Sequence, residues 1–310
     1  MGEITFKDRV AIVTGAGTGL GRSHALGLAA RGAKVVVNDL GVGRDGVGAS
    51  SEAAEAVVVE IKEMGGEAMA HGCDVSDEDG VKDMVAQAMD AWGRVDIAVN
   101  NAGILRDKTF AKMALEDFRK VVDVHLMGTA TCCHACWPVM RDQNYGRIVL
   151  TTSASGLYGN FGQSNYGAAK AAMAGLMNVL HIEGARDNIR VNTLAPTAAT
   201  RMTEDLIPPE ALALLAPETI TPGVLYLVSE DAPSRVILGA GAGSFARTRV
   251  FETRGVTLQD EENTPETIAA RFDEISDPMD QEELQNAFEQ TQKYVRNAAK
   301  ARGLNLNWGD

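Results

Sequence analysis

The segment Val10–Gly21, with the sequence VAIVTGAGTGLG, decides the fold of this chain. It opens with an apolar, β-branched run that is typical of a buried strand, and a helical segment follows it. Between the two stand Gly15, Gly17, Gly19 and Gly21. Glycines at such a turn let a pyrophosphate approach the backbone, and the start of the helix presents free N–H groups to the anion. The order of strand, glycine turn and helix therefore predicts a dinucleotide-binding unit.

Outward from this segment, short runs rich in valine and isoleucine alternate with helical patterns. The further predicted strands are Lys34–Asn38, Ala68–Gly72, Val95–Asn100, Arg147–Thr151, Ile189–Ala195 and Val236–Leu238. The predicted helices are Leu20–Ala30, Ser51–Met64, Glu78–Trp92, Leu115–Met140 and Gly167–Arg186. Nearly continuous apolar strands are typical of a parallel sheet that is covered by helices on both faces. We expect a doubly wound, Rossmann-like α/β fold, which binds its ligands beyond the carboxyl ends of the strands.

The last fifth of the chain differs in composition from the rest. Residues 1–246 are expected to form the catalytic and dinucleotide-binding domain, whereas 247–310 are charged. Helices over Thr264–Ile275 and Gln281–Lys300 predict a helical extension that packs on the core or on a partner subunit. Upstream, residues 202–216 are a candidate lid over a substrate cleft, and ordinary core packing is the other explanation for the leucines there, which are Leu206, Leu212, Leu214 and Leu215.

Charge and composition exclude several classes of partner. The net charge of −13 argues against binding to nucleic acid or to anionic membranes. No apolar run approaches the roughly 20 residues that span a bilayer, and the first residues lack a secretory signal pattern, so we expect a cytoplasmic protein. Three of the four cysteines, Cys132, Cys133 and Cys136, share one predicted helix. They are expected to be small buried hydrophobes, and no metal site is predicted.

Asp39 points to the identity of the dinucleotide. It ends the second predicted strand about 20 residues after the glycines, where a carboxylate hydrogen-bonds the ribose hydroxyl. Because the same charge repels a 2′-phosphate, NAD(H) is favoured over NADP(H). The alternative is that Asp39 only caps the strand and that Arg44, in the long glycine-rich loop 40–50, receives a phosphate.

Polar residues also follow the third and fourth predicted strands. Asp74 is placed to accept a hydrogen bond from an adenine amino group, or else it caps the helix that follows. Asn101, Ala102 and Gly103 come directly after the fourth strand. Amides at such a strand end combine local backbone bonds with a position on the cofactor site, and we expect both roles here.

Tyr166 and Lys170 lie four residues apart, on one face of a predicted helix. A free phenol has a pKa of about 10, too high for a base at neutral pH. A nearby ammonium and an oxidised nicotinamide both favour the phenolate and are expected to lower that pKa. Ser153, at the end of the fifth predicted strand, is placed to hold a substrate oxygen. Alone, the pair would read as an accidental surface pair, but with the serine and the glycine turn it predicts an alcohol dehydrogenase site.

These strings together resemble the classical short-chain dehydrogenase/reductase family. The resemblance implies that Ser153, Tyr166 and Lys170 are catalytic. It also implies NAD(H) contacts from Gly15, Thr18, Gly19, Leu20, Gly21, Asp39, Asp74, Val75, Asn101, Ala102, Gly103, Tyr166, Lys170 and Thr200. Thr200 follows Pro196 in a string that lacks the glycine of the family pattern. His125 stands where the family usually has an asparagine that helps the lysine to hold a relay water. It either supports that relay or is a buried histidine bonded to backbone.

Longer strings resemble one group within the family, the dehydrogenase units of peroxisomal multifunctional enzymes of type 2. They are Val36–Leu40, Asn101–Asp107, Ser153–Gln163 and Arg201–Thr203. The resemblance implies a (3R)-hydroxyacyl-CoA dehydrogenase, and some members also oxidise 17β-hydroxysteroids. Candidate substrate contacts are Arg106, Lys108, Ser155, Tyr158 and Arg201. The cations among them are suited to CoA phosphates, although they are equally explained as ordinary surface charges.

Two other functions remain open at this point, a steroid or other lipid-alcohol dehydrogenase and an NAD(H)-binding regulatory protein on an inactive enzyme fold. The intact serine, tyrosine and lysine favour an enzyme. Thioester reduction with NADPH is disfavoured by Asp39. The helix over Gly167–Arg186 is more apolar around its circumference than one buried face requires. We therefore expect a homodimer or homotetramer.

Overall fold

The computed structural model describes residues 2–43, 45–46, 50–198 and 208–306. The chain divides into two compact units, Met1–Thr248 and Arg249–Asp310. The first unit contains the sheet and the predicted site residues. Within the described ranges, no helix is long and apolar enough to cross a membrane.

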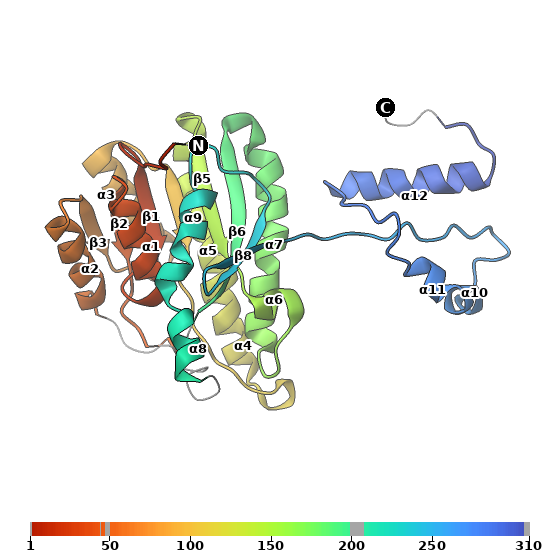
Figure 1. Ribbon diagram of the computed structural model, residues 1–310, viewed down its shortest axis with the longest axis horizontal. Coiled ribbons are helices and arrows are strands. Elements are labelled where there is room, and N and C mark those ends of the chain that lie inside the picture. Colours follow the sequence, from red (N-terminus) through yellow and green to blue (C-terminus); the bar gives the residue numbers. More distant parts are fainter. Residues whose placement is uncertain (1, 44, 47–49, 199–207, 307–310) are drawn as a thin grey trace. The chain divides into compact units, whose positions relative to one another are not determined.

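The sheet of the first unit has the strand order β3-β2-β1-β4-β5-β6-β7-β8, and helices lie on both of its faces (Figure 1). The parallel strands are β1 (Val10–Thr14), β2 (Lys34–Asn38), β3 (Ala68–His71), β4 (Ile97–Asn100), β5 (Gly146–Thr151), β6 (Ile189–Thr197) and β7 (Ile237–Gly241). This arrangement confirms the predicted doubly wound α/β fold. The order reverses between β1 and β4, which creates the crevice where such folds bind ligands.

The last strand, β8 (Ser244–Thr248), pairs antiparallel with β7 and was not predicted. Ala242 and Gly243 form the two-residue turn between them, both with positive φ, of 50° and 72°. A turn of this kind is typical of a tight hairpin. Because β8 is an exposed edge strand, it lacks the buried apolar run by which the other strands were found.

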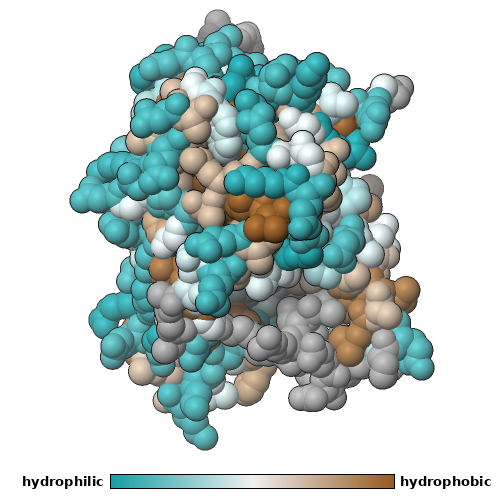
Figure 2. All heavy atoms as spheres, turned by 90° about the vertical axis from the view of Figure 1, so that its left-hand side faces the viewer, coloured by the Kyte–Doolittle hydropathy of each residue, from teal (hydrophilic) through white to brown (hydrophobic). Residues whose placement is uncertain are grey.

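Helices cover the two faces of the sheet in two groups. One face carries α1 (Gly19–Ala29), α2 (Glu52–Glu63) and α9 (Thr221–Leu227). The other carries α3 (Glu78–Trp92), α4 (Leu115–Val122), α5 (Gly128–Asp142) and α7 (Ser164–Gly184). Short helices are α6 (Ala154–Tyr158) and α8 (Pro209–Leu214). The outer surface at the β3 edge of the sheet is mainly hydrophilic (Figure 2), as expected for helices that bury only one side.

The single helix predicted over Leu115–Met140 is interrupted. A π-helical turn, Asp123–Met127, separates α4 from α5. The wider turn places both Val124 and His125 inside the protein. A π-turn adds a residue without ending the helix, so the apolar pattern continues across it and the sequence does not show the break. Such turns are frequent at functional sites.

The second unit contains three helices in its described part, α10 (Pro265–Ala270), α11 (Phe272–Ile275) and α12 (Ala287–Ala301). The helix predicted to begin at Gln281 begins at Ala287, because Asn286 caps it by accepting a hydrogen bond from the N–H of Glu289. Lys293, on α12, donates hydrogen bonds to Glu252 and to the carbonyl oxygen of Thr253. In its described part, the extension therefore consists of two short helices and one of 15 residues, joined by irregular segments.

Candidate active site

A cleft of about 570 Å³ lies beyond the carboxyl ends of β1, β2 and β4. Its lining includes the predicted cofactor residues Gly15, Thr18, Gly19, Leu20, Asp39, Asp74, Val75, Asn101, Ala102 and Gly103. Residues from four separate segments of the sequence thus meet at one site. This is the position at which a doubly wound sheet binds a dinucleotide.

The glycine turn is built for close packing. Gly15 and Gly19 have positive φ, of 63° and 54°, a conformation that side chains disfavour. Gly21 lies behind the turn, where a Cβ atom would stand 2.1 Å from the carbonyl oxygen of Gly15. The side-chain nitrogen of Asn101 donates hydrogen bonds to the carbonyl oxygens of Thr14 and Gly15, at 3.1 and 3.0 Å. Asn101 therefore fixes the turn through backbone bonds and also lines the cleft.

Asp39 holds two glycine segments together. One carboxylate oxygen accepts the N–H of Gly17 and the other accepts the N–H of Gly41, both at 2.7 Å. Each oxygen retains a further lone pair, and the side chain lines the cleft. The alternative phosphate ligand, Arg44, lies outside the described residues.

Asp74 is not the cap of α3. That role belongs to Asp77, which accepts the N–H of Asp79 at 3.2 Å. Asp74 instead accepts hydrogen bonds from the N–H and the hydroxyl of Ser76, at 2.9 and 2.6 Å. Although burial alone would raise the pKa of Asp74, these bonds and the ammonium of Lys120 lower it. An ionised carboxylate therefore lines this end of the cleft.

The three residues predicted to be catalytic lie together. Ser153 follows β5 and caps α6, and its hydroxyl is close enough to the phenol of Tyr166, on α7, to lower the pKa of that phenol. Lys170, one turn further along α7, has its ammonium nitrogen 5.7 Å from the centre of the Tyr166 ring. That nitrogen donates to the carbonyl oxygen of Thr151 at 2.6 Å. The site thus joins a hydroxyl, a phenol and an amine at the carboxyl end of one strand.

The expected lowering of the phenol pKa is wrong for the protein alone. Burial raises the pKa of Tyr166, and the negative charge of Asp107 adds to this, while the hydrogen bond with Ser153 acts in the opposite direction. Lys170 is only 4% exposed, and burial lowers its own pKa to about 7. The amine therefore loses part of its positive charge near neutral pH, which weakens the effect that the sequence predicted.

His125 is held by backbone and packs against the catalytic tyrosine. Its Nε2 lies 2.8 Å from the carbonyl oxygen of Ile104 and 3.1 Å from the nitrogen of the same residue. Its ring stands edge-on to Tyr166, with centroids 5.2 Å apart. Burial and the charge of Lys170 lower the pKa of His125 to about 3. The imidazole is thus neutral at physiological pH and orients its neighbours rather than exchanging protons.

This buried histidine makes stability depend on pH. In the unfolded chain a histidine has its ordinary pKa of 6.5, so below that pH the unfolded state binds a proton that the folded state excludes. Stability from this group is complete above pH 6.5 and falls toward pH 3. When the pH falls from about 7 to about 5, the free energy of unfolding of the wild type should decrease. We expect the decrease to be about 2 kcal/mol smaller in His125→Asn. Urea unfolding at both pH values measures this, and equal losses in the two proteins would contradict it.

The candidate substrate contacts have mixed surroundings. Arg106 pairs with Asp117 at 2.7 Å, whereas Lys108 is exposed. The hydroxyl of Ser155 donates to Gln163 at 2.7 Å. Tyr158 is 74% exposed. Thr200, Arg201 and Leu206 lie outside the described residues, as does the first part of the predicted lid; the described part is α8.

Cys132, Cys133 and Cys136, on α5, are buried as predicted, whereas Cys73 is half-buried. Burial raises the pKa of each of these thiols. In the described ranges, no three histidine, cysteine or acidic side chains gather in a way that would hold a metal ion.

Comparison with known proteins identifies the family. The family model for short chain dehydrogenases matches residues 9–211. A putative short-chain type dehydrogenase/reductase of Mycobacterium tuberculosis is 50% identical over 272 residues, 87% of this chain and 95% of the relative. The peroxisomal hydratase-dehydrogenase-epimerase of Saccharomyces cerevisiae is 49% identical over 282 residues, 90% of this chain but 31% of the relative.

A solved structure agrees with these matches. The full-length peroxisomal multifunctional enzyme type 2 of Drosophila melanogaster aligns with a TM-score of 0.80 and 37% identity, over 96% of this chain and 50% of that one. The chain thus spans nearly the whole mycobacterial relative but half or less of these two multifunctional proteins. The matched family model and the high identity over most of the chain show that it belongs to the short-chain dehydrogenase family and is an oxidoreductase.

Proposed function

We propose that this oxidoreductase oxidises a (3R)-3-hydroxyacyl-CoA to the 3-oxoacyl-CoA, with NAD⁺ as the hydride acceptor. The observation that carries the proposal is the group of Ser153, Tyr166 and Lys170 beside a dinucleotide cleft that contains Asp39. The resemblance to the dehydrogenase units of multifunctional enzymes supports a thioester substrate, and the yeast relative carries dehydrogenase in its name.

The cleft fits the proposed cofactor. Thr18, at the start of α1, makes no side-chain capping bond, so the first N–H groups of that helix remain for an anion such as a pyrophosphate. Asp39 would hold the ribose hydroxyls and Asp74 the adenine amino group. Asn101, Val75 and Gly103 would line the remainder of the site, with Thr200 and Lys170 near the nicotinamide end. A bound nicotinamide supplies the acceptor for hydride.

The chain's own residues handle the proton. Ser153 would hold the substrate oxygen by a hydrogen bond, and Tyr166, ionised to the phenolate, would take up the hydroxyl proton as the C–H bond breaks. In the reverse direction the same phenol returns the proton. Lys170 favours the phenolate when it is charged, and His125 fixes the orientation of the tyrosine ring. All four groups lie at or next to the carboxyl end of β5 or on the helices that face it.

Asp39→Ser is expected to move the cofactor preference toward NADP⁺. The variant removes the charge that repels a 2′-phosphate, and it also removes bonds to Gly17 and Gly41. We expect the affinity for NAD⁺ to fall about 10- to 100-fold, as for lost hydrogen bonds to a charged group. Asp39→Asn is the companion variant, because it also removes the charge but keeps one accepting oxygen for the N–H of either Gly17 or Gly41. An unchanged ratio of the kcat/KM values for NADP⁺ and NAD⁺ in both variants would contradict the assignment.

Positively charged side chains, Arg106, Lys108 and Arg201, are proposed to meet the phosphates of CoA. Lys108 is exposed and suited to this contact, whereas Arg106 has to exchange its pairing with Asp117. Arg201 is proposed for the same role. Ser155 and Tyr158, on α6 next to the catalytic serine, are proposed to contact the acyl part of the substrate.

The test of this function is a comparison of substrate classes. NAD⁺-linked turnover of a (3R)-3-hydroxyacyl-CoA and of a 17β-hydroxysteroid is followed by the absorbance of NADH. Preferential turnover of the thioester supports the proposal. Turnover of the steroid alone assigns the protein to lipid-alcohol oxidation without CoA. Tight NAD⁺ binding without turnover of any alcohol supports a regulatory protein instead.

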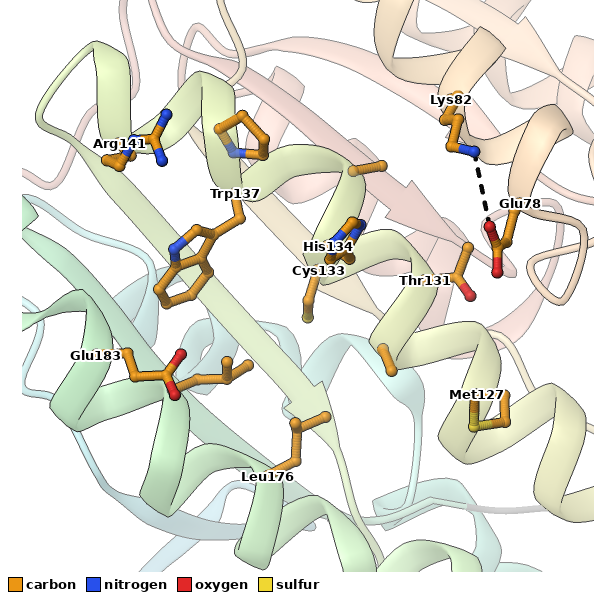
Figure 3. A pocket seen from close by; sticks show the side chains of 14 residues that line it. Glu78, Lys82, Met127, Thr131, Cys133, His134, Trp137, Arg141, Leu176 and Glu183 are labelled. Carbon is orange, nitrogen blue, oxygen red and sulfur yellow. Dashed lines mark ion pairs between the residues drawn. The ribbon is translucent and has the colours of Figure 1, made fainter.

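We also propose that the chain self-associates through the face formed by α5 and α7. A groove of about 570 Å³ runs along this face, and Trp137 and Leu176 line it (Figure 3). The groove carries both Arg141 and Glu183. A two-fold axis brings the same surface of two copies together, and a surface that carries both signs of charge allows Arg141 of one copy to pair with Glu183 of the other.

Ile182→Glu is expected to reduce the molecular mass in solution. Ile182, on α7, is 52% exposed, and an added charge would be buried between two copies. Val59→Glu on α2, at a residue that is 54% exposed, is the matched control. Light scattering should show one assembly for the wild type and Val59→Glu, and a smaller species for Ile182→Glu. An unchanged mass for Ile182→Glu would assign this face to some other use.

A further inference from the structure

The segment 104–108 connects the dinucleotide cleft with the catalytic residues. Ile104, at its start, lines the cleft. His125, which packs against the catalytic tyrosine, contacts both backbone polar atoms of Ile104. Further along, the side-chain amide of Asn165 donates to the carbonyl oxygen of Arg106 at 2.9 Å. The backbone N–H of Lys108 donates to a carbonyl oxygen in the turn before α7, at Gly162, over 2.9 Å.

The strongest of these attachments joins Gln163 to Asp107. The amide nitrogen of Gln163 donates to a carboxylate oxygen of Asp107 at 2.7 Å. The amide oxygen accepts from the hydroxyl of Ser155 at 2.7 Å and from the amide of Asn160 at 3.0 Å. Because a carboxylate only accepts, the nitrogen has to face Asp107, which fixes the orientation of the amide. Gln163 is 5% exposed, so these bonds form away from solvent.

The same contacts lead to both catalytic oxygens. The backbone N–H of Ser155 donates to the hydroxyl oxygen of Ser153 at 3.2 Å. Gln163 directly precedes α7, and Tyr166 lies in the first turn of that helix. A movement of Gln163 therefore acts on Ser153 through α6 and on Tyr166 through the start of α7.

We propose that Gln163 and Asp107 form a latch that holds segment 104–108 against α6 and α7 and thereby positions Ser153 and Tyr166 for proton transfer. The inference rests on the proposed function, since it concerns the same site. Gln163 is a positioning residue, which acts through Ser155 and through the helix that carries the phenol. Sequence reasoning missed it because its partners lie in two distant segments and its effect depends on their contact.

Loss of the hydrogen bond between Gln163 and Asp107 should release the whole segment 104–108. The second carboxylate oxygen of Asp107 is buried and accepts no hydrogen bond from the described residues. Asp107 as a whole is half-buried, so the bond from Gln163 offsets part of the cost of withdrawing this carboxylate from water. Without Gln163, segment 104–108 should move toward water, and the backbone contacts at Ile104 and Lys108 should weaken with it.

Three variants test the latch. Gln163→Glu places a second carboxylate against Asp107, and Gln163→Met removes the hydrogen bonds at nearly constant volume. The double substitution D107N/Q163E exchanges donor and acceptor, keeps the total charge of the pair, and leaves an oxygen for Ser155 and Asn160. If the double variant recovers kcat, the activity depends on a hydrogen bond between positions 107 and 163 and not on the native residues themselves.

Two measurements decide the outcome. We expect either single variant to lower kcat at least about tenfold, while the KM for NAD⁺ changes less than about threefold, and the double variant to recover most of kcat. Hydrogen exchange at the amides of 104–108 should speed up in the single variants and return toward the wild-type rate in the double variant. A wild-type kcat in both folded single variants, or a folded double variant without recovery, overturns the latch.

The exchange measurement needs no substrate. If the wild type oxidises no hydroxyacyl-CoA, the proposed function fails, but the exchange rates still decide the latch. Unchanged hydrogen exchange at the amides of 104–108 in Gln163→Met then overturns the proposed latch. Faster hydrogen exchange that the double variant reverses supports the latch.

Discussion

Tyr166→Phe is expected to lower kcat by about 10²- to 10⁴-fold, the contribution of a positioned general acid or base. The phenol oxygen is the group that receives the alcohol proton, and phenylalanine retains the ring that packs against His125. Binding of NADH should change less than about threefold, because the substitution removes one hydroxyl at the edge of that site.

The control for this prediction is Tyr226→Phe. Tyr226 lies on α9 and is 43% exposed, and loss of its hydroxyl should leave kcat unchanged. Steady-state kinetics with one (3R)-3-hydroxyacyl-CoA give the kcat values of Tyr166→Phe and of Tyr226→Phe. If Tyr166→Phe retained more than a tenth of the wild-type kcat, the phenol would not be the proton acceptor.

Gly103→Ala is expected to destabilise the fold and weaken cofactor binding. A Cβ atom at Gly103 would stand 2.2 Å from Cε1 of the His125 ring. Gly103 is not among the residues with positive φ, so the effect is steric and not a matter of backbone conformation. The ring cannot move aside without losing its contacts to Ile104. We expect a loss of about 1–3 kcal/mol, the usual cost of an overpacked site.

A second substitution tests whether the ring is the obstacle. His125→Asn replaces the ring by a smaller side chain, so it should restore part of the stability that Gly103→Ala loses. Gly175→Ala is the matched control, because a Cβ atom there meets nothing within 4 Å. Chemical denaturation of the wild type, the two single variants and the double variant gives the coupling energy between residues 103 and 125. NADH titrations of the same proteins show the effect on cofactor binding. Strictly additive losses in the double variant would show that some other contact limits residue 103.

The sequence predicted the parts of the fold that depend on local pattern. Buried β-branched runs located β1 and β2 at their observed bounds, and the glycine turn predicted the cleft between the two halves of the sheet. The hydrophobic pattern did not predict an exposed edge strand or a break inside a long helix. The edge strand β8 has no buried run, and the π-turn at Asp123–Met127 preserves the apolar pattern while it shifts the helix.

The candidate site was predictable where several residue types occur together at fixed spacing, as Tyr166 and Lys170 do with Ser153 and the glycine turn. Contacts between distant segments were not. The backbone bonds expected of Asn101 were found, but the sequence did not name the glycine turn as their partner. Gln163 bonds to Asp107 across 56 positions, a contact that the order of residues does not show. The expected effect of Lys170 on the phenol failed for the same reason, since it depends on how deeply the amine is buried.

The most direct measurement of the central claim is NAD⁺-linked oxidation of (3R)- against (3S)-3-hydroxyacyl-CoA of one chain length, followed at the absorbance of NADH. Ser153 and Tyr166 present a single arrangement of hydrogen-bonding groups to the substrate oxygen, so only one enantiomer can direct its C–H bond at the acceptor. We predict turnover of the (3R) thioester and none of the (3S) form. Turnover of the (3S) thioester alone, or of neither, would contradict the account.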